Sequence, residues 1–119
     1  MTETNSYPNS TTAFIALGSN LGDRIANLEL ALNLLNENPN VKVIKISNWL
    51  KNPAIEGAGP HEFLNGVAKL ETKLNPHELL DLLLEVESKI DPERNQRGRK
   101  QARMIDLDLL NYANMRIKD

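Results

Sequence analysis

The chain has 119 residues, of which 40% are hydrophobic and 25% charged, a composition typical of one compact globular domain. Its 14 basic and 16 acidic residues give a formal net charge of −2, which excludes overall attraction to nucleic acid or to an anionic membrane surface. The absence of cysteine excludes disulfides, thiolate metal sites and cysteine nucleophiles. No apolar run approaches the roughly 18 residues that span a bilayer and no signal-peptide pattern opens the chain, so we expect a cytoplasmic protein with no membrane partner.

The first residues predict a tail followed by one domain. Residues 1–12 are rich in Thr, Asn and Ser and lack periodicity, so we expect them to be disordered. A single domain then covers residues 13–119. The apolar run over residues 13–17 ends at Gly18-Ser19-Asn20, which predicts a central strand followed by a turn.

A helix and a second strand follow. Leucine and isoleucine at steps of three and four predict a helix over residues 22–37, with Asn20 or Asp23 as its N-cap. β-Branched residues then predict a strand over residues 41–49. Its two lysines are three positions apart and can share a face of the sheet only if a bulge lies at Val43-Ile44.

The second half of the domain repeats the order of strand, helix and strand. A loop rich in proline and glycine covers residues 51–61, and alternating residues then predict a strand over 63–71. Asn75 precedes a helix expected over residues 76–90, with proline at its first position and glutamate at its third. Alternation of apolar and acidic residues predicts a last strand within residues 104–112.

The predicted order is strand, helix, strand, strand, helix, strand. Two right-handed split βαβ units satisfy the connection rules for this order. We therefore expect an α+β domain of the ferredoxin-like βαββαβ arrangement, with a four-stranded antiparallel sheet and both helices on one face. This arrangement alone does not indicate a function.

The clearest chemical feature is the sequence Ile105-Asp106-Leu107-Asp108-Leu109. On a strand the two carboxylates share one face, about 6.6 Å apart, and the leucines share the other. At an effective dielectric constant of about 20, two such charges about 6 Å apart repel by about 2.8 kcal/mol, so a cation is expected between or beside them. Hard oxygen ligands suit Mg²⁺. The alternative is a solvated face of the strand, or ion pairs with nearby arginines.

A basic segment, residues 94–103, comes directly before these aspartates and contains no acidic residue. Guanidinium groups beside a pair of carboxylates make a plausible clamp for a triphosphate. The alternatives are a solvated loop and a nucleic-acid contact. Aromatic residues amount to only 4% of the chain, which argues against base stacking on the sheet.

Other candidates are single residues. Asn65 is a polar residue within an apolar strand and could hydrogen-bond the edge of a heterocycle. Phe63 and Trp49 could stack on a planar ligand, although positions in strands favour the core for both. Glu87 lies near the end of the second helix, either on the surface or close to the acidic strand.

Several motifs taken together resemble the 6-hydroxymethyl-7,8-dihydropterin pyrophosphokinase family of folate biosynthesis. The resemblance runs in order from about Thr12 to the last residue. The two most specific motifs are I-A-L-G-S-N-L-G-D at residues 15–23 and R-M-I-D-L-D-L-L at 103–110. Shorter matches between them are F-L-N at 63–65, L-E-T at 70–72 and P-H-E-L-L at 76–80.

The resemblance implies a ferredoxin-like fold and a magnesium-dependent transfer of pyrophosphate from ATP to the hydroxymethyl group of the pterin, with release of AMP. Two Mg²⁺ ions would be held by Asp106 and Asp108, and Arg103 would steady the transferred group. Arg94 and Arg97 would contact the nucleotide from the loop, together with Glu87. ATP and the pterin are then the partners, and the family suggests a monomer that binds no nucleic acid.

The pterin pocket implied by the resemblance draws on three parts of the chain. Asn65 would hydrogen-bond the pterin edge, Phe63 would stack on the ring where the family often has tyrosine, and Gly18 would adjoin them. The last part is the backbone around three loop residues, Asn52, Pro53 and Ile55.

The sequence departs from the family pattern in three places. The family's R-W-G-P-R-T is here R-K-Q-A-R-M at residues 99–104, without the tryptophan that covers the nucleotide and the proline that stiffens the loop. Asn52 replaces the usual threonine. The last residue, Asp119, comes before the family's P-H-P segment, so we expect a C-terminally shortened member. Two alternative functions therefore stay open: a non-catalytic domain that binds nucleotide or pterin, and a basic-loop nucleic-acid module.

Overall fold

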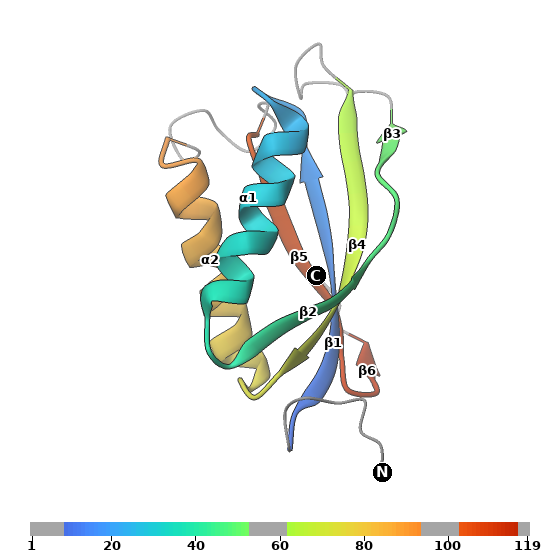
Figure 1. Cartoon of the computed structure of the whole chain (residues 1–119), viewed down its shortest axis with the longest axis vertical. Helices are drawn as coiled ribbons and strands as arrows, with labels where there is room; N and C mark the ends of the chain where they lie inside the picture. The colour runs from blue at the N-terminus through green and yellow to red at the C-terminus, as the bar shows by residue number, and fades with distance from the viewer. Residues whose placement is uncertain (1–8, 53–61, 94–102, 117–119) are drawn as a thin grey trace.

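The computed structural model describes residues 9–52, 62–93 and 103–116. In this part of the chain two helices pack against an antiparallel sheet (Figure 1). The elements are β1 (Thr11–Ser19), α1 (Arg24–Glu37), β2 (Val41–Ile46), β3 (Leu50–Asn52), β4 (Phe63–Thr72), α2 (Pro76–Ile90), β5 (Asp106–Tyr112) and β6 (Met115–Arg116). Neither helix is both long and apolar enough to cross a membrane.

The strands follow the order β2-β4-β1-β5-β6, and β3 pairs with the same edge of β4 as β2 does. Every pairing is antiparallel. The predicted α+β class and antiparallel sheet are confirmed, but the described sheet has six strands where four were expected. The two additional strands, β3 and β6, are both short.

The physical reasons for these two strands differ. The expected strand over 41–49 ends at Ile46, because Ser47 breaks the regular pairing: its hydroxyl accepts the N–H of Val67 while its own N–H donates to the Val67 carbonyl. The chain then pairs with β4 again as β3. β6 follows a tight turn at Ala113, whose φ of 57° lies in the left-handed region, where alanine is uncommon. This turn and β6 were not predicted from the sequence, although Asn114, the other residue of the turn, is of a type that favours turns.

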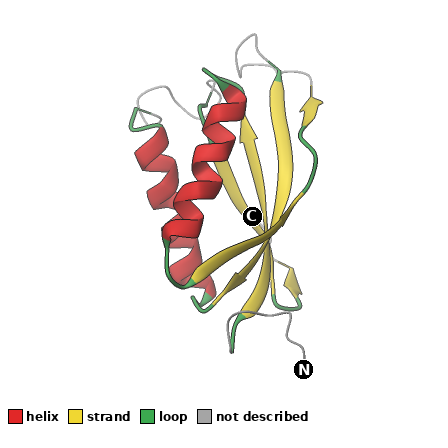
Figure 2. Ribbon diagram, viewed as in Figure 1, coloured by secondary structure: helices red, strands yellow, loops and turns green. Residues whose placement is uncertain are grey.

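The helices lie side by side on one face of the sheet (Figure 2), and the hydrophobic core fills the space between the two layers. On β1, alternate residues face this core, and Ala13, Ile15 and Leu17 are at most 1% exposed. Leu70 of β4 and Leu79 of α2 are fully buried in the same cluster. Among the described residues, no helix lies on the other face of the sheet.

Local sequence signals set the helix starts. Asp23, one of the two expected caps, accepts the N–H of Ala26 and begins α1. Asn75 begins α2 with a complete capping box, in which its side chain accepts from Glu78 N and the Glu78 carboxylate accepts from Asn75 N. The predicted bounds of α2 are confirmed, because an N-cap and the first-turn proline fix the same start.

Two details of the strands also bear on the predictions. The register of β2 against β4 shifts between Val43 and Lys45, which confirms the expected bulge. β1 begins at Thr11, so Thr11 and Thr12 belong to the sheet and not to the tail expected over residues 1–12. The hydroxyls of Ser10 and Thr12 both donate to the Glu71 carboxylate on β4. These side-chain bonds add to the pairing of β1 with β4 at the start of β1.

Candidate active site

A cavity of about 590 Å³ opens on the face of the sheet opposite the two described helices. It lies near the end of the sheet where β1 finishes and β4 and β5 begin, an end that can be followed in Figure 1. Five of the residues singled out in the sequence line it: Gly18, Phe63, Asn65, Asp106 and Asp108. They come from three adjacent strands. The cavity therefore brings the expected pterin residues and the expected metal ligands to one place.

The register of the sheet explains this grouping. Gly18 of β1 stands between Asn65 of β4 on one side and Asp106 of β5 on the other. Ala16, two residues earlier, is opposite Asp108. Residues opposite one another in an antiparallel sheet share a face, and so do residues two apart. All these side chains therefore point away from the helices, while the leucines between them point into the core.

Gly18 lets the Asn65 amide lie against the backbone of β1. A methyl group at Gly18 would lie 2.5 Å from Asn65 Oδ1 and 3.5 Å from the Phe63 ring. Any larger residue here would displace the amide. The amide and the aromatic ring therefore sit side by side over a strand that has no side chain at this point.

Arg103 lies beside Asp106, one of the two aspartates that line the cavity. Its Nη1 lies 3.8 Å from Asp106 Oδ1, with the arginine side chain 16% exposed and the aspartate 42%. Asp108 is more exposed than Asp106. The sequence expectation that Asp106 and Asp108 share the face opposite the leucines is confirmed, since Leu107 and Leu109 are buried.

Two buried side chains hold the backbone around these residues. Asn20, expected as a possible helix cap, instead bonds Arg103 twice: its Oδ1 accepts the Arg103 N–H at 2.8 Å, and its N–H donates to the Arg103 carbonyl at 3.0 Å. Glu87 is 3% exposed, and its Oε2 accepts the N–H of Leu107, between the two aspartates, at 2.7 Å. The second helix therefore reaches the acidic strand through Glu87, and the nucleotide contact expected for this residue stays a prediction.

The oxygen donors of the cavity suit a hard divalent cation that takes its remaining ligands from water and substrate. Within the described ranges, no three His, Cys, Asp or Glu side chains form a group that could enclose a metal ion. Asp106 and Asp108 offer carboxylate oxygens from one face of a strand. Mg²⁺ is commonly bound by one or two carboxylates, with water and substrate phosphates completing its octahedron. Two carboxylates beside an open cavity satisfy that requirement.

Some residues of the cavity were missed by the sequence analysis, and some predictions fall outside the described residues. Ser47, Asn48 and Leu50 also line the cavity; the two polar residues within a β-branched run were a signal of the strand break. Trp49 packs against the core, the position that its place in the sequence favoured. Asn52 ends β3, and four predicted residues lie outside the described ranges: Pro53, Ile55, Arg94 and Arg97.

Comparison with known proteins matches residues 14–118 to the model of one family, 7,8-dihydro-6-hydroxymethylpterin-pyrophosphokinase. The chain belongs to this family. The match covers almost the whole chain, including all the residues of the cavity, and agrees with the resemblance carried by the two end motifs.

Curated relatives support the same assignment. The chain is 35% identical over 108 residues to the 2-amino-4-hydroxy-6-hydroxymethyldihydropteridine pyrophosphokinase of Haemophilus influenzae, a match that covers 87% of this chain and 63% of that protein. It is 33% identical to the pyrophosphokinase of Methylorubrum extorquens, covering 92% and 68%. The bifunctional protein FolKE of Lactococcus lactis subsp. cremoris is 35% identical, covering 91% and 30%. The chain thus spans less than two thirds of the length of two of these three relatives.

Proposed function

We propose that this chain transfers the pyrophosphoryl group of ATP to the hydroxymethyl group of 6-hydroxymethyl-7,8-dihydropterin, giving AMP and the pterin diphosphate. The observation that carries the proposal is the cavity, in which an amide and an aromatic ring lie on the same face as two carboxylates. One part suits a flat heterocycle, and the other suits a metal-bound phosphate chain. Membership of the family supports the assignment.

The pterin is proposed to lie at Asn65 and Phe63. The amide of Asn65 offers both a donor and an acceptor to the edge of the ring, and Phe63 offers an apolar surface to its plane. Gly18 leaves room for both. Asn52, Pro53 and Ile55 are proposed to complete this pocket from the connection between β3 and β4.

The triphosphate is proposed to lie at Asp106 and Asp108. These aspartates would hold Mg²⁺, and we propose two ions; bound Mg²⁺ supplies neutralisation of the phosphate charge as the transfer proceeds. Arg103 orients the transferred group and stabilises its charge.

In the reaction the pterin hydroxyl oxygen bonds to the β-phosphorus, and the bond from that phosphorus to the α-phosphate oxygen breaks. The residues act mainly by positioning the two substrates in line. Arg94, Arg97 and Glu87 are the proposed nucleotide contacts.

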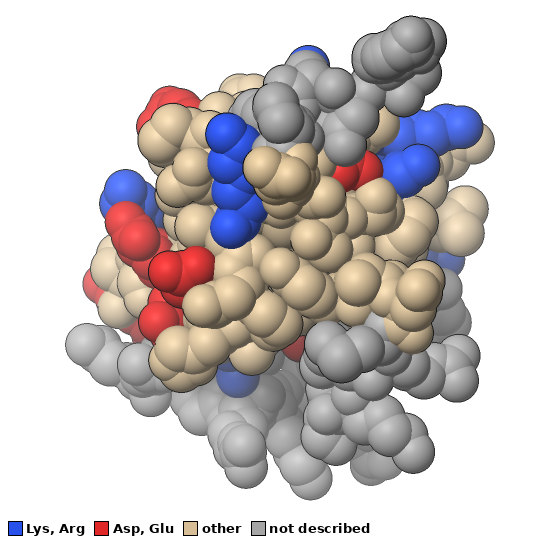
Figure 3. Space-filling view, turned by 90° about the horizontal axis from the view of Figure 1, so that it is seen from below, with Lys and Arg blue, Asp and Glu red and all other residues tan. Residues whose placement is uncertain are grey.

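Further aspects of the proposal concern the fold and the partners. The order of the four longer strands, β2-β4-β1-β5, supports a ferredoxin-like arrangement to which β3 and β6 are additions. We also propose a cytoplasmic monomer that binds no nucleic acid. At the end of the molecule shown in Figure 3, the described acidic and basic side chains lie around an uncharged area.

The deciding experiment measures AMP release from ATP and Mg²⁺ by the 119-residue chain, with and without 6-hydroxymethyl-7,8-dihydropterin. Pterin-dependent AMP is the expected result. Binding of ATP and pterin by a folded chain without AMP formation would support the binding-only alternative instead. Binding of oligonucleotides without either small molecule would favour the nucleic-acid alternative.

A further inference from the structure

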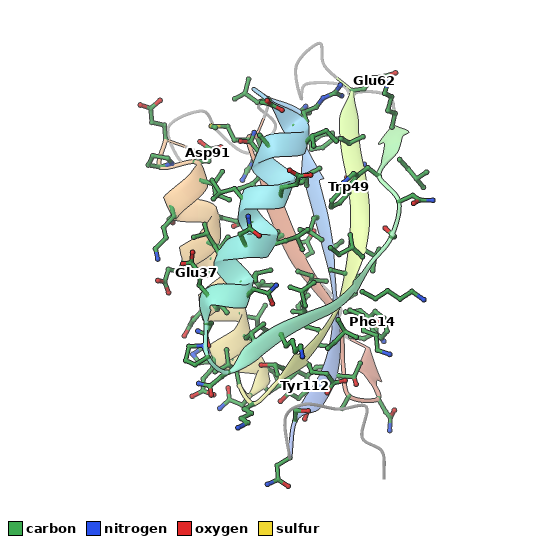
Figure 4. The ribbon with its side chains drawn as sticks, in the orientation of Figure 1. Phe14, Glu37, Trp49, Glu62, Asp91 and Tyr112 are labelled. Atoms are coloured by element: carbon green, nitrogen blue, oxygen red, sulfur yellow. The ribbon has the colours of Figure 1, made fainter. Side chains whose placement is uncertain are left out.

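The end of α2 carries a buried carboxylate that the proposed reaction does not use. Asp91 is 1% exposed and forms the C-cap of α2 (Figure 4). Its Oδ2 accepts the backbone N–H of Met104 at 3.1 Å. A negative charge at a helix C-terminus is disfavoured by the helix dipole. The hydrogen bond to Met104 is one of the contacts that offset this cost.

Met104 belongs to a short irregular stretch, residues 103–105, that leads into β5. Side chains hold the backbone N–H groups along and just after this stretch. Asn20 accepts from Arg103, Asp91 from Met104, and Glu87 from Leu107. The positions of Arg103 and Asp106 at the cavity therefore depend on side chains from the β1–α1 connection and from α2.

We propose that Asp91 is a positioning residue for the transfer reaction, acting through the Met104 N–H on the backbone that carries Arg103 and Asp106. This inference rests on the proposed function. The hydrogen bond fixes Met104, one of the two residues between Arg103 and Asp106. It thereby fixes the approach of the Arg103 guanidinium to the Asp106 carboxylate, 3.8 Å apart. A displacement of about 1 Å of such groups can lower a rate by about 100-fold.

The hydrogen bond requires an oxygen acceptor at this position and does not require a charge. Asp91→Asn keeps the acceptor, whereas Asp91→Ala removes it and leaves the Met104 N–H without that partner. We expect kcat to fall about 10- to 100-fold in D91A and to stay within about threefold of wild type in D91N. The KM for the pterin should stay within about twofold in both, because the proposed pterin residues lie on β1 and β4.

The matched control is Glu93→Ala, an exposed acidic residue two positions further along the chain. E93A should behave as wild type. Should D91A fail to fold, Asp91→Glu replaces it, because one additional methylene moves the acceptor without removing it. Wild-type kcat in the folded D91A or D91E protein would overturn the proposal, as would D91N no more active than D91A.

A second readout does not depend on turnover. We expect hydrogen exchange of the Met104 amide to be about tenfold faster in D91A, and the Arg103 Nε–H resonance to move, with both near wild type in D91N. A role confined to ending α2 would lower the melting temperature in D91A and leave both signals unchanged, which would overturn the proposal. If the wild-type chain forms no AMP, the proposed function fails by itself, and these signals still decide whether Asp91 positions the segment.

Discussion

Neighbouring residues of β1 face two different environments. Ile15 is fully buried under the helices, whereas Phe14, one residue before it, is 37% exposed on the open face. The same alternation runs through β5, where Leu107 and Leu109 enter the core and Asp106 and Asp108 line the cavity. Packing against the helices therefore determines which residues are tolerated on the covered face. On the open face, the groups proposed to bind substrate and metal determine them. Substitutions on the two faces should separate stability from activity.

The largest effect should come from the covered face. Ile15→Ala removes a side chain with 0% exposure and leaves a cavity in the core, which should lower the free energy of unfolding by about 2–5 kcal/mol. Phe14→Ala is the matched control on the open face and should cost clearly less, because its ring already contacts solvent. Urea denaturation of both variants measures the difference. Equal losses would mean that the open face is packed as tightly as the core.

The largest effect on activity should come from the open face. Asp106→Ala should lower pterin-dependent AMP formation by about 100- to 1000-fold, because a carboxylate proposed to bind the metal is lost. The free energy of unfolding should change little, since the side chain is 42% exposed. Asp81→Ala on α2, also exposed and acidic, is the control and should leave the rate unchanged. Turnover by D106A at the wild-type rate would sink the metal assignment.

Two glycines allow the same change to be made on opposite faces. At Gly18, an added methyl would meet the Asn65 amide at 2.5 Å, and at Gly66 it would meet the Trp49 ring at 2.4 Å. An amide can rotate away, so Gly18→Ala should raise the KM for the pterin about tenfold at little cost in stability. The indole packs against the core, so Gly66→Ala should instead lower the free energy of unfolding by about 1–3 kcal/mol. Steady-state kinetics and thermal unfolding measure the two effects, and the opposite pattern would contradict the orientation of Asn65.

Features with short-range causes were predictable from the sequence. The start of α2 follows from Asn75, Pro76 and Glu78, which lie within four residues of one another. The shared face of Asp106 and Asp108 follows from the alternation of side chains along a strand. The resemblance to the family supplied the prediction of the residues expected to bind the pterin.

Features with long-range causes were not predictable in this way. Asn20 looked like a helix cap, but its partner Arg103 is 83 residues away. Asp91 and Glu87 bond backbone groups 13 and 20 residues further along the chain. Acceptors of this kind have no sequence pattern, because any backbone N–H that the fold brings close can serve as the donor. The break at Ser47 likewise depends on its bond to β4.

The smallest predicted effect concerns two lysines that the bulge in β2 brings to the open face. The register places Lys45 opposite Lys69 and Lys42 opposite Glu71. Like charges directly opposite each other in a sheet are destabilising, so Lys45→Glu should raise the free energy of unfolding by about 0.2–1 kcal/mol. Lys42→Glu makes the same change in charge opposite a carboxylate and should lower it by a similar amount. Both effects should shrink at high salt, because exposed charges are screened. Urea midpoints at low and high salt measure them, and the same sign in both variants would contradict the register. Because the bulge alone puts both lysines on one face, this pair of variants tests a feature that was read from the spacing of two residues.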